Sequence, residues 1–159
     1  MIRRCLALFL LGWTGFAQAE PVVLEVVDPA GVVARRFPLA DGQGWCLLWN
    51  HSVAGFTVRD CFAWRAPHLV LTYSHQPDFA AGLGHIEGRG VLRDDGAGGY
   101  VIDGIDGPLP GNRLVLRVGS AAVDHRIEIA GAVHSLSAVH AGQRIELRVA
   151  PAAGVESVQ

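Results

Sequence analysis

The residues best suited to chemistry lie between Trp45 and Trp64, the segment that is densest in aromatic side chains. Two strand-like runs flank Ala54-Gly55 there, which predicts a β-hairpin. Side chains alternate between the two faces of a strand, so His51 and Asp60 are expected on the same apolar face, diagonally across the hairpin and in contact. A polar pair on such a face predicts either a structural hydrogen bond or a pocket for a ligand or a metal ion.

Cys46 and Cys61 are the two cysteines beyond the N-terminal leader. The same alternation places them together on the opposite face of the hairpin, in register or nearly so. Because a secreted chain meets an oxidising compartment, this arrangement predicts a cross-strand disulfide. Metal ligation by the two thiols is the alternative, which the absence of a CxxC pair disfavours.

A metal site is a second way to use the histidines of the chain. His51, His75 and His85 could converge with Asp60 and Asp78 if the glycine-rich loop after the hairpin folds over it. Neutral imidazole and carboxylate groups suit zinc or copper. No HxH, HxxxH or HExxH spacing supports such a site, so the metal-binding interpretation remains an alternative and no cofactor is expected.

Catalysis has less support. His51-Ser52 and Asp60 contain the residue types of a hydrolase triad, but adjacent strand residues point to opposite faces, so Ser52 cannot serve His51. No GxSxG sequence is present. Gly82 and Gly84 are not followed by the helix and lysine of a phosphate-binding loop. The chain therefore favours a protein that is not an enzyme.

The first 19 residues have the features of a secretory signal peptide. Arg3 and Arg4 precede an apolar run, and Ala17-Gln18-Ala19 is a typical cleavage signal. Cleavage after Ala19 predicts a periplasmic or secreted protein that contacts a membrane only during export. The apolar run is short for a membrane-spanning helix, so a retained anchor is the disfavoured alternative.

The charge of the mature chain limits its partners. Without the leader, 11 arginines stand against 15 acidic residues, a net charge of −4, and no lysine is present. A negative chain is poorly suited to bind nucleic acid or an anionic membrane. A small-molecule ligand or a protein partner is more compatible with this charge.

The remaining sequence predicts strands and turns. Two β-branched runs around Pro29-Ala30-Gly31 predict a first hairpin, and residues 68–75 extend the central hairpin into a meander. Asp103–Gly107 has some features of a calcium loop but is better explained by ordinary turns. Residues 133–137 predict a short strand or a single helical turn. Further strands are expected at 90–93, 99–103, 113–118, 126–129 and 144–149.

No segment beyond the leader shows a sustained helical period of apolar residues, and turn signals recur throughout. We therefore expect a single all-β domain over residues 20–150, built as an antiparallel β-sandwich or a partly closed barrel. Residues 151–159 are small and polar and are expected to form a flexible tail.

Several short motifs carry a resemblance to a known family. Trp49-x-His51-Ser52-Val53 is followed by an acid at Asp60, by Ser74 and by Ala81-Gly82-Leu83-Gly84. This pattern resembles the domain of unknown function 1850 family of small exported bacterial proteins, from about Val22 to Val149. The resemblance implies ligand-binding roles for His51, Ser52, Asp60, Ser74, Gly82 and Gly84.

Members of that family are often encoded beside the solute receptor and fused permease of TAXI-type TRAP transporters. The resemblance therefore implies an exported accessory or ligand-binding domain, with a TRAP-type permease or its receptor as partner. The alternative is a periplasmic metal-binding protein that uses His51, Asp60 and nearby loop histidines.

Overall fold

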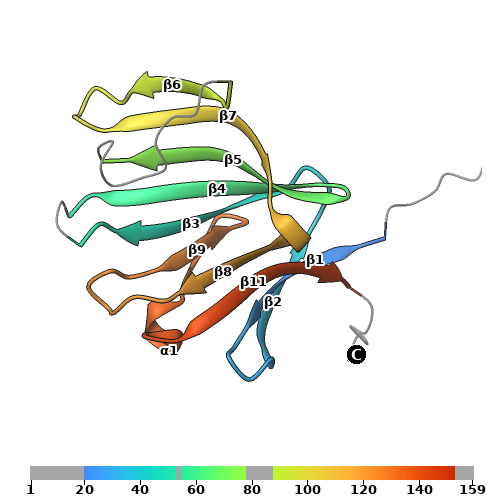
Figure 1. Ribbon diagram of the computed structural model, residues 1–159. Helices are drawn as coiled ribbons and strands as arrows, with labels where there is room; N and C mark the ends of the chain where they lie inside the picture. Colours follow the sequence, from blue (N-terminus) through green and yellow to red (C-terminus); the bar gives the residue numbers. More distant parts are fainter. Residues whose placement is uncertain (1–19, 53–54, 78–87, 153–159) are drawn as a thin grey trace, which may run out of the picture.

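The computed structural model describes residues 20–52, 55–77 and 88–152, which form two antiparallel sheets. One sheet has four strands in the order β2-β1-β11-β8, and the other has seven in the order β10-β9-β3-β4-β5-β7-β6 (Figure 1). The strands are β1 (Val22–Val27), β2 (Val33–Leu39), β3 (Gly44–Asn50), β4 (Thr57–Arg65), β5 (His68–Gln76), β6 (Val91–Asp94), β7 (Tyr100–Pro108), β8 (Arg113–Arg117), β9 (Arg126–Ile129), β10 (Ala132–Ser135) and β11 (Arg144–Pro151). A short 3₁₀ helix, η1 (Pro110–Asn112), and one helical turn, α1 (Ser137–His140), complete the elements.

The two sheets pack as a sandwich around one main hydrophobic core, as the alternating strands predict. Leu24 and Leu147 from the four-stranded sheet meet Trp45 and Ile127 from the seven-stranded sheet, and all four are almost wholly buried. Burying a side chain of this size contributes about 1.5–3 kcal/mol. The predicted all-β fold is therefore confirmed, and of its two forms the sandwich is correct.

The central hairpin forms as predicted. β3 pairs with β4 in a register that places Cys46 opposite Cys61 and Leu47 opposite Asp60. β4 then pairs with β5, which completes the expected meander. Asp60 itself lies opposite Leu47 and Ser74, just before a register shift between Cys61 and Phe62 in the pairing with β5, and its side chain is on the face of the sheet that points toward the core.

The seven-stranded sheet extends beyond the smaller sheet that covers it. Its β5, β7 and β6 strands carry a second hydrophobic cluster of Tyr100, Ile102 and Ile105, with Leu71 and Leu92 packed against it. Among the described residues, no side chain of the four-stranded sheet belongs to this cluster. Figure 1 shows these strands at the end of the sheet away from β1 and β2. The boundary between the two clusters is therefore a distinct part of the inner face.

Two local predictions are revised. β7 continues to Pro108, so the turns predicted for Asp103–Gly107 are wrong. The strand passes this glycine-containing stretch through a register shift against β5, with Gly104 at φ 66°, a conformation that glycine adopts without strain. The strand and the helical turn predicted as alternatives for residues 133–137 both occur, as β10 followed by α1. No helix in the described part of the chain is long and apolar enough to cross a membrane.

Candidate ligand-binding site

A polar cluster of two buried residues and the partly buried Asp60 lies on the inner face of the seven-stranded sheet. Ser74 Oγ donates a hydrogen bond of 2.6 Å to Asp60 Oδ1. Gln76 Nε2 donates to Ser74 Oγ at 2.9 Å and reaches Asp60 Oδ1 at 3.4 Å. Ser74 and Gln76 are only 1% and 3% exposed. We call these three residues the Asp60 cluster.

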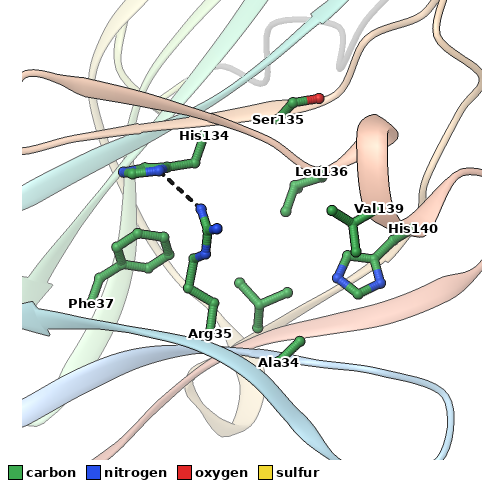
Figure 2. A pocket seen from close by; sticks show the side chains of 9 residues that line it. Ala34, Arg35, Phe37, His134, Ser135, Leu136, Val139 and His140 are labelled. Carbon is green, nitrogen blue, oxygen red and sulfur yellow. Dashed lines mark hydrogen bonds between the residues drawn. The ribbon is translucent and has the colours of Figure 1, made fainter.

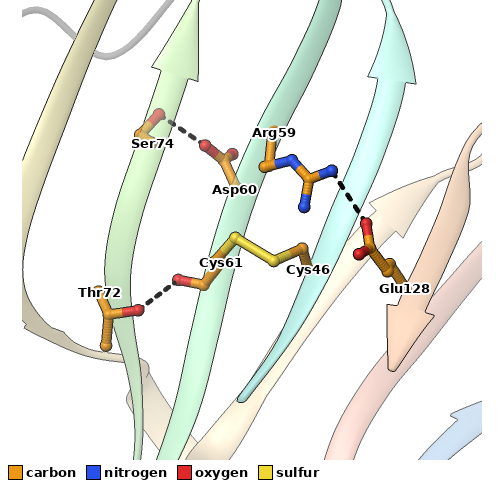
Figure 3. The surroundings of a disulfide bond; sticks show 7 residues. All are labelled: Cys46, Arg59, Asp60, Cys61, Thr72, Ser74 and Glu128. Carbon is orange, nitrogen blue, oxygen red and sulfur yellow. Dashed lines mark hydrogen bonds and ion pairs between the residues drawn. A yellow bond between two sulfur atoms is a disulfide. The ribbon is translucent and has the colours of Figure 1, made fainter. Parts of the chain in front are cut away.

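The positions of these residues follow from strand geometry. Asp60 lies directly opposite Ser74 in the pairing of β4 with β5. Gln76 follows Ser74 by two residues on the same strand, so it points to the same face. Figure 3 shows the Asp60 and Ser74 side chains directed toward each other across the two strands. The cluster is therefore built into paired strands rather than loops.

The cluster is rich in hydrogen-bond acceptors. Gln76 Oε1 is buried and has no hydrogen-bond partner among the residues that the structure describes. Burial raises the pKa of Asp60, and the hydrogen bonds from Ser74 and Gln76 offset part of this effect. A buried carboxyl beside a spare amide oxygen favours a neighbour that carries N–H or O–H groups.

The predicted contact between His51 and Asp60 is wrong. His51 lies just beyond the end of β3, where its backbone N–H donates a hydrogen bond of 2.8 Å to Phe56 O, whereas Asp60 lies opposite Leu47. Four residues of strand separate the two positions, a distance of about 13 Å. His51 therefore lies at the open end of the hairpin, and Asp60 is held from β5 instead.

The structure describes two of the other predicted ligand-binding residues, Ser74 and Ser52. Ser74 contacts Asp60, whereas Ser52 is exposed in the turn after β3. Gly82 and Gly84 lie outside the described residues.

The set of metal ligands proposed from the sequence is not assembled in the described part of the chain. His75 faces away from the Asp60 cluster, where its Nε2 lies 2.8 Å from Asp95 Oδ2 and its ring contacts the Phe56 ring edge-on. The hydrogen bond from His75 is the main cause of a lowered pKa of Asp95. Across residues 20–52, 55–77 and 88–152, no three His, Cys, Asp or Glu side chains are placed to hold a metal ion. Asp78 and His85 lie outside these ranges.

The disulfide between Cys46 and Cys61 is formed, as predicted (Figure 3). It joins directly opposed residues of β3 and β4, on the face away from Asp60. Arg59 Nη2 and Glu128 Oε2 form an ion pair of 2.9 Å on the same face. The covalent link fixes the β3–β4 register and, through it, the position of Asp60 on the inner face.

A small cavity of about 70 Å³ lies at one edge of the sandwich, between β2 and the β10–α1 segment (Figure 2). Arg35 Nη1 donates a hydrogen bond of 3.0 Å to His134 Nδ1, and the His134 ring packs against Phe37 with 4.8 Å between centroids. Since Arg35 and Phe37 belong to one sheet and His134 to the other, these contacts close this edge of the sandwich. The cavity is small, and its histidines play no part in the Asp60 cluster.

Gln76 and Glu25 are among the buried polar residues that the sequence analysis missed. Gln76 was expected to begin the loop after β5, although its two-residue spacing from Ser74 indicates that it shares the strand face. Glu25, only 4% exposed, accepts a hydrogen bond of 2.9 Å from Arg36 Nε, and its Oε2 lies 2.9 Å from Arg148 Nη2. A glutamate within a β-branched strand, with arginines alternating on later strands, was the available signal.

These observations define an all-β sandwich with a disulfide-linked central hairpin and a buried carboxyl cluster. The family described as Domain of unknown function (DUF1850) matches residues 46–136, more than half of the chain. The chain therefore belongs to this family, as the sequence motifs predict, and the matched region includes the disulfide and the Asp60 cluster. No curated protein and no solved structure matches the chain.

Proposed function

We propose that the mature chain is an exported, non-enzymatic accessory domain of a TRAP-type (TAXI) solute transport system, and that it holds a small ligand at the Asp60 cluster. The observation that carries the ligand site is the buried Gln76 Oε1, which has no partner in the described part of the chain and lies in the same side chain that binds Ser74. Leaving a buried acceptor unpaired costs about 1–3 kcal/mol, and a ligand donor would remove that cost.

The chemistry of the cluster selects the class of ligand. Asp60 and Gln76 present oxygens at a site where burial already disfavours a bare carboxylate, as the raised pKa of Asp60 reflects. A ligand with an amino, amide or hydroxyl group supplies donors to both oxygens, and an ammonium group also balances the carboxylate charge. We therefore propose a small polar solute that carries at least one such donor.

The same geometry favours binding over catalysis. Ser74 donates its proton to Asp60, and Gln76 donates in turn to Ser74 Oγ. A serine nucleophile needs a base such as histidine within hydrogen-bond reach, and the hairpin register holds His51 about 13 Å along the strand from Asp60. The Ser74 hydroxyl therefore serves as a structural donor within the cluster.

A solute screen tests the ligand site. Amines, polyols and amides are added singly to the mature protein, and the melting temperature is measured for the wild type, Asp60→Asn, Gln76→Leu and the exposed control Asp106→Asn. We expect at least one donor-bearing solute to stabilise the wild type and the control but neither cluster variant. Equal stabilisation of all four proteins would show that binding occurs elsewhere. No response to any solute would contradict a ligand site of this class.

The association with transport and export needs separate tests. The proposed association with transport rests on membership of the family, because members of this family are often encoded beside TRAP-type transporters. The full chain is expressed with the permease and solute receptor encoded in the same genome, and cross-linked complexes are isolated from the cell envelope. We expect the chain to start at Glu20 and to be recovered with one of these two partners. Recovery of uncleaved chain, or of neither partner, would contradict this proposal.

A further inference from the structure

The outer face of the four-stranded sheet carries an unusual concentration of arginine. The register places Arg36, Glu25, Arg148 and Arg113 in one row across β2, β1, β11 and β8. Arg144 and Arg117 are directly opposed in a second row across β11 and β8. We call this surface the arginine face, and its positive residues are Arg36, Arg113, Arg117, Arg144 and Arg148.

The acidic residues of this surface neutralise only part of its charge. Glu25 is shared by Arg36 and Arg148, at 2.9 Å from each. Glu146 Oε2 lies 3.6 Å from Arg113 Nη1, and Glu146 Oε1 lies 3.9 Å from Arg148 Nη1. Within the described ranges, Arg117 and Arg144 belong to none of the ion pairs. Five arginines thus face two glutamates on a mature chain whose net charge is −4.

Repulsion between opposed arginines lowers the stability of this sheet in the isolated protein. Arg113 lies opposite Arg148, with Glu146 within ion-pair distance of both, whereas Arg117 lies opposite Arg144 and neither has an ion pair in the described ranges. Directly opposed like charges destabilise an antiparallel sheet. An anionic partner would relieve the repulsion, so the arrangement is better suited to a complex than to the free domain.

The shape of the surface adds an apolar component. A concavity of about 420 Å³ lies beside Arg113, Arg144 and Arg148, and Pro29 and Val115 contribute to its lining. Val115 is 43% exposed at the middle of β8, between Arg113 and Arg117. The nearby carboxylate of Asp28 already accepts hydrogen bonds from the backbone of its own turn. A bound group therefore meets cationic positions on either side of an apolar one.

We propose that the arginine face docks an extended acidic segment of a partner protein. In this segment, one carboxylate side chain lies on each side of an apolar side chain. Arg113 and Arg117 are four residues apart on β8, a distance of about 13 Å, which matches the spacing of residues i and i+4 in an extended segment. The residue between them, at i+2, then lies over Val115. The charges are complementary in sign and in spacing.

A protein segment fits this surface better than a polyanion does. One carboxylate of the segment lies at Arg117, beside Arg144, and neither of these arginines has an ion pair in the described ranges; the other lies at Arg113, whose contact with Glu146 is 3.6 Å. Nucleic acid or an anionic bilayer would also approach the negative remainder of the chain. This inference goes beyond the proposed ligand site, because it uses the outer face of the other sheet and needs neither Asp60 nor its ligand.

A designed peptide tests the proposal on the whole mature protein. Fluorescein-labelled Glu-Thr-Val-Thr-Glu is titrated by fluorescence anisotropy at low salt, with Lys-Thr-Val-Thr-Lys as the matched control peptide. We expect binding of the acidic peptide alone, and weaker binding as the salt concentration rises past about 0.15 M because of screening. Absence of binding by the acidic peptide, or equal binding of both peptides, would overturn the proposal.

Two double variants with the same change in net charge locate the surface. Arg117→Glu with Arg144→Glu reverses the two arginines that lack ion pairs, and Arg65→Glu with Arg93→Glu reverses two exposed arginines of the other sheet. We expect the first pair to weaken binding about tenfold or more and the second to change it less than about twofold. Equal losses would show that only net charge matters. If the first variant does not fold, Arg117→Ala with Arg144→Ala is compared with Arg65→Ala with Arg93→Ala, which again have the same change in net charge.

Other occupants give different results. Flotation with vesicles of phosphatidylglycerol, without peptide binding, would replace the proposal with a lipid surface. Sedimentation as a dimer that Arg117→Glu with Arg144→Glu dissociates, again without peptide binding, would replace it with a second copy of the chain. Either outcome leaves the Asp60 solute screen unaffected, so the two proposals fail separately.

Discussion

Ser74 Oγ donates a 2.6 Å hydrogen bond to Asp60 Oδ1, and this contact joins two adjacent strands on the inner face of the larger sheet. It identifies the partner of the buried carboxyl as a hydroxyl on β5, not the imidazole at the end of β3. The carboxyl is thus held by neutral donors, and its charge has no cation among its hydrogen-bond partners Ser74 and Gln76. This relationship makes the ionisation of Asp60 a measurable property of the fold.

The first prediction concerns the pH dependence of stability at Asp60. Burial raises its pKa, so the folded state binds the proton more tightly than the unfolded state. The resulting stabilisation is complete below the ordinary aspartate pKa, about 3.9, and is lost as the pH rises through the raised value. Asp60→Asn keeps an acceptor for Ser74 and removes the charge. We expect this variant to gain stability relative to the wild type between about pH 4 and pH 7, measured by urea unfolding.

The control for this experiment is Asp106→Asn, because Asp106 is largely exposed in its pair with Arg65. Its difference from the wild type should be small at both ends of the pH range. A difference for Asp60→Asn that does not change with pH would show that the Asp60 carboxyl titrates as in the unfolded chain.

The second prediction concerns Glu25. Burial alone raises the pKa of Glu25, but hydrogen bonds and charge from Arg36 and Arg148 outweigh it, so the pKa lies below its usual range. The stabilisation is present above the ordinary glutamate pKa, about 4.3, and is lost as the pH falls through the lowered value. We expect Glu25→Gln to lower the free energy of unfolding at neutral pH by about 2 kcal/mol. The loss should shrink in acid, and a constant loss in acid and at neutral pH would contradict the ion-pair explanation.

The two buried carboxyls show which parts of the structure a sequence can predict. The meeting of Cys46 with Cys61 follows from strand alternation and one turn, a local property of two neighbouring runs. The distance between His51 and Asp60 does not follow from parity. That distance depends on the register of the hairpin. The expected diagonal contact requires Asp60 opposite Trp49, whereas Asp60 lies opposite Leu47, two residues further along β3 from His51.

The Glu25 network illustrates a second limit. Glu25 and Arg148 are 123 residues apart, and they meet because β1 lies between β2 and β11. Nothing in the alternation of β11 specifies which strand is its neighbour, since each half-buried strand offers the same apolar face. The charged outer faces were therefore predictable, whereas the particular ion pairs and the arginine face depend on sheet order.

The third prediction concerns the disulfide. It closes a loop with a sequence separation of 15, and a loop of this length is expected to stabilise the fold by about 3 kcal/mol through the unfolded state. We expect Cys46→Ser with Cys61→Ser to lower the free energy of unfolding by about this amount. Adding a reductant to the wild type should produce the same midpoint in urea. A reduced wild type that unfolds at the midpoint of the oxidised protein would show that the link does not stabilise the hairpin.

The fourth prediction uses two glycines near the end of the sheet that carries the second hydrophobic cluster. Gly90 and Gly96 have almost the same backbone conformation, at φ 79° and 77°. A Cβ at position 90 would lie 2.7 Å from Asp103 O and 2.9 Å from Ile102 Cγ2, whereas one at position 96 would meet nothing within 4 Å. Alanine at either position incurs the cost of a positive φ, about 1–2 kcal/mol, but only Gly90→Ala adds a clash with a neighbouring strand. We expect Gly90→Ala to be the more destabilising variant by at least about 1 kcal/mol in thermal and urea unfolding.

Because Ile102 lies opposite Ser74 across β5 and β7, Gly90→Ala should also weaken binding of any solute that stabilises the wild type, and Gly96→Ala should not. Equal effects of the two substitutions on stability and binding would show that close packing of β7 does not support the Asp60 cluster.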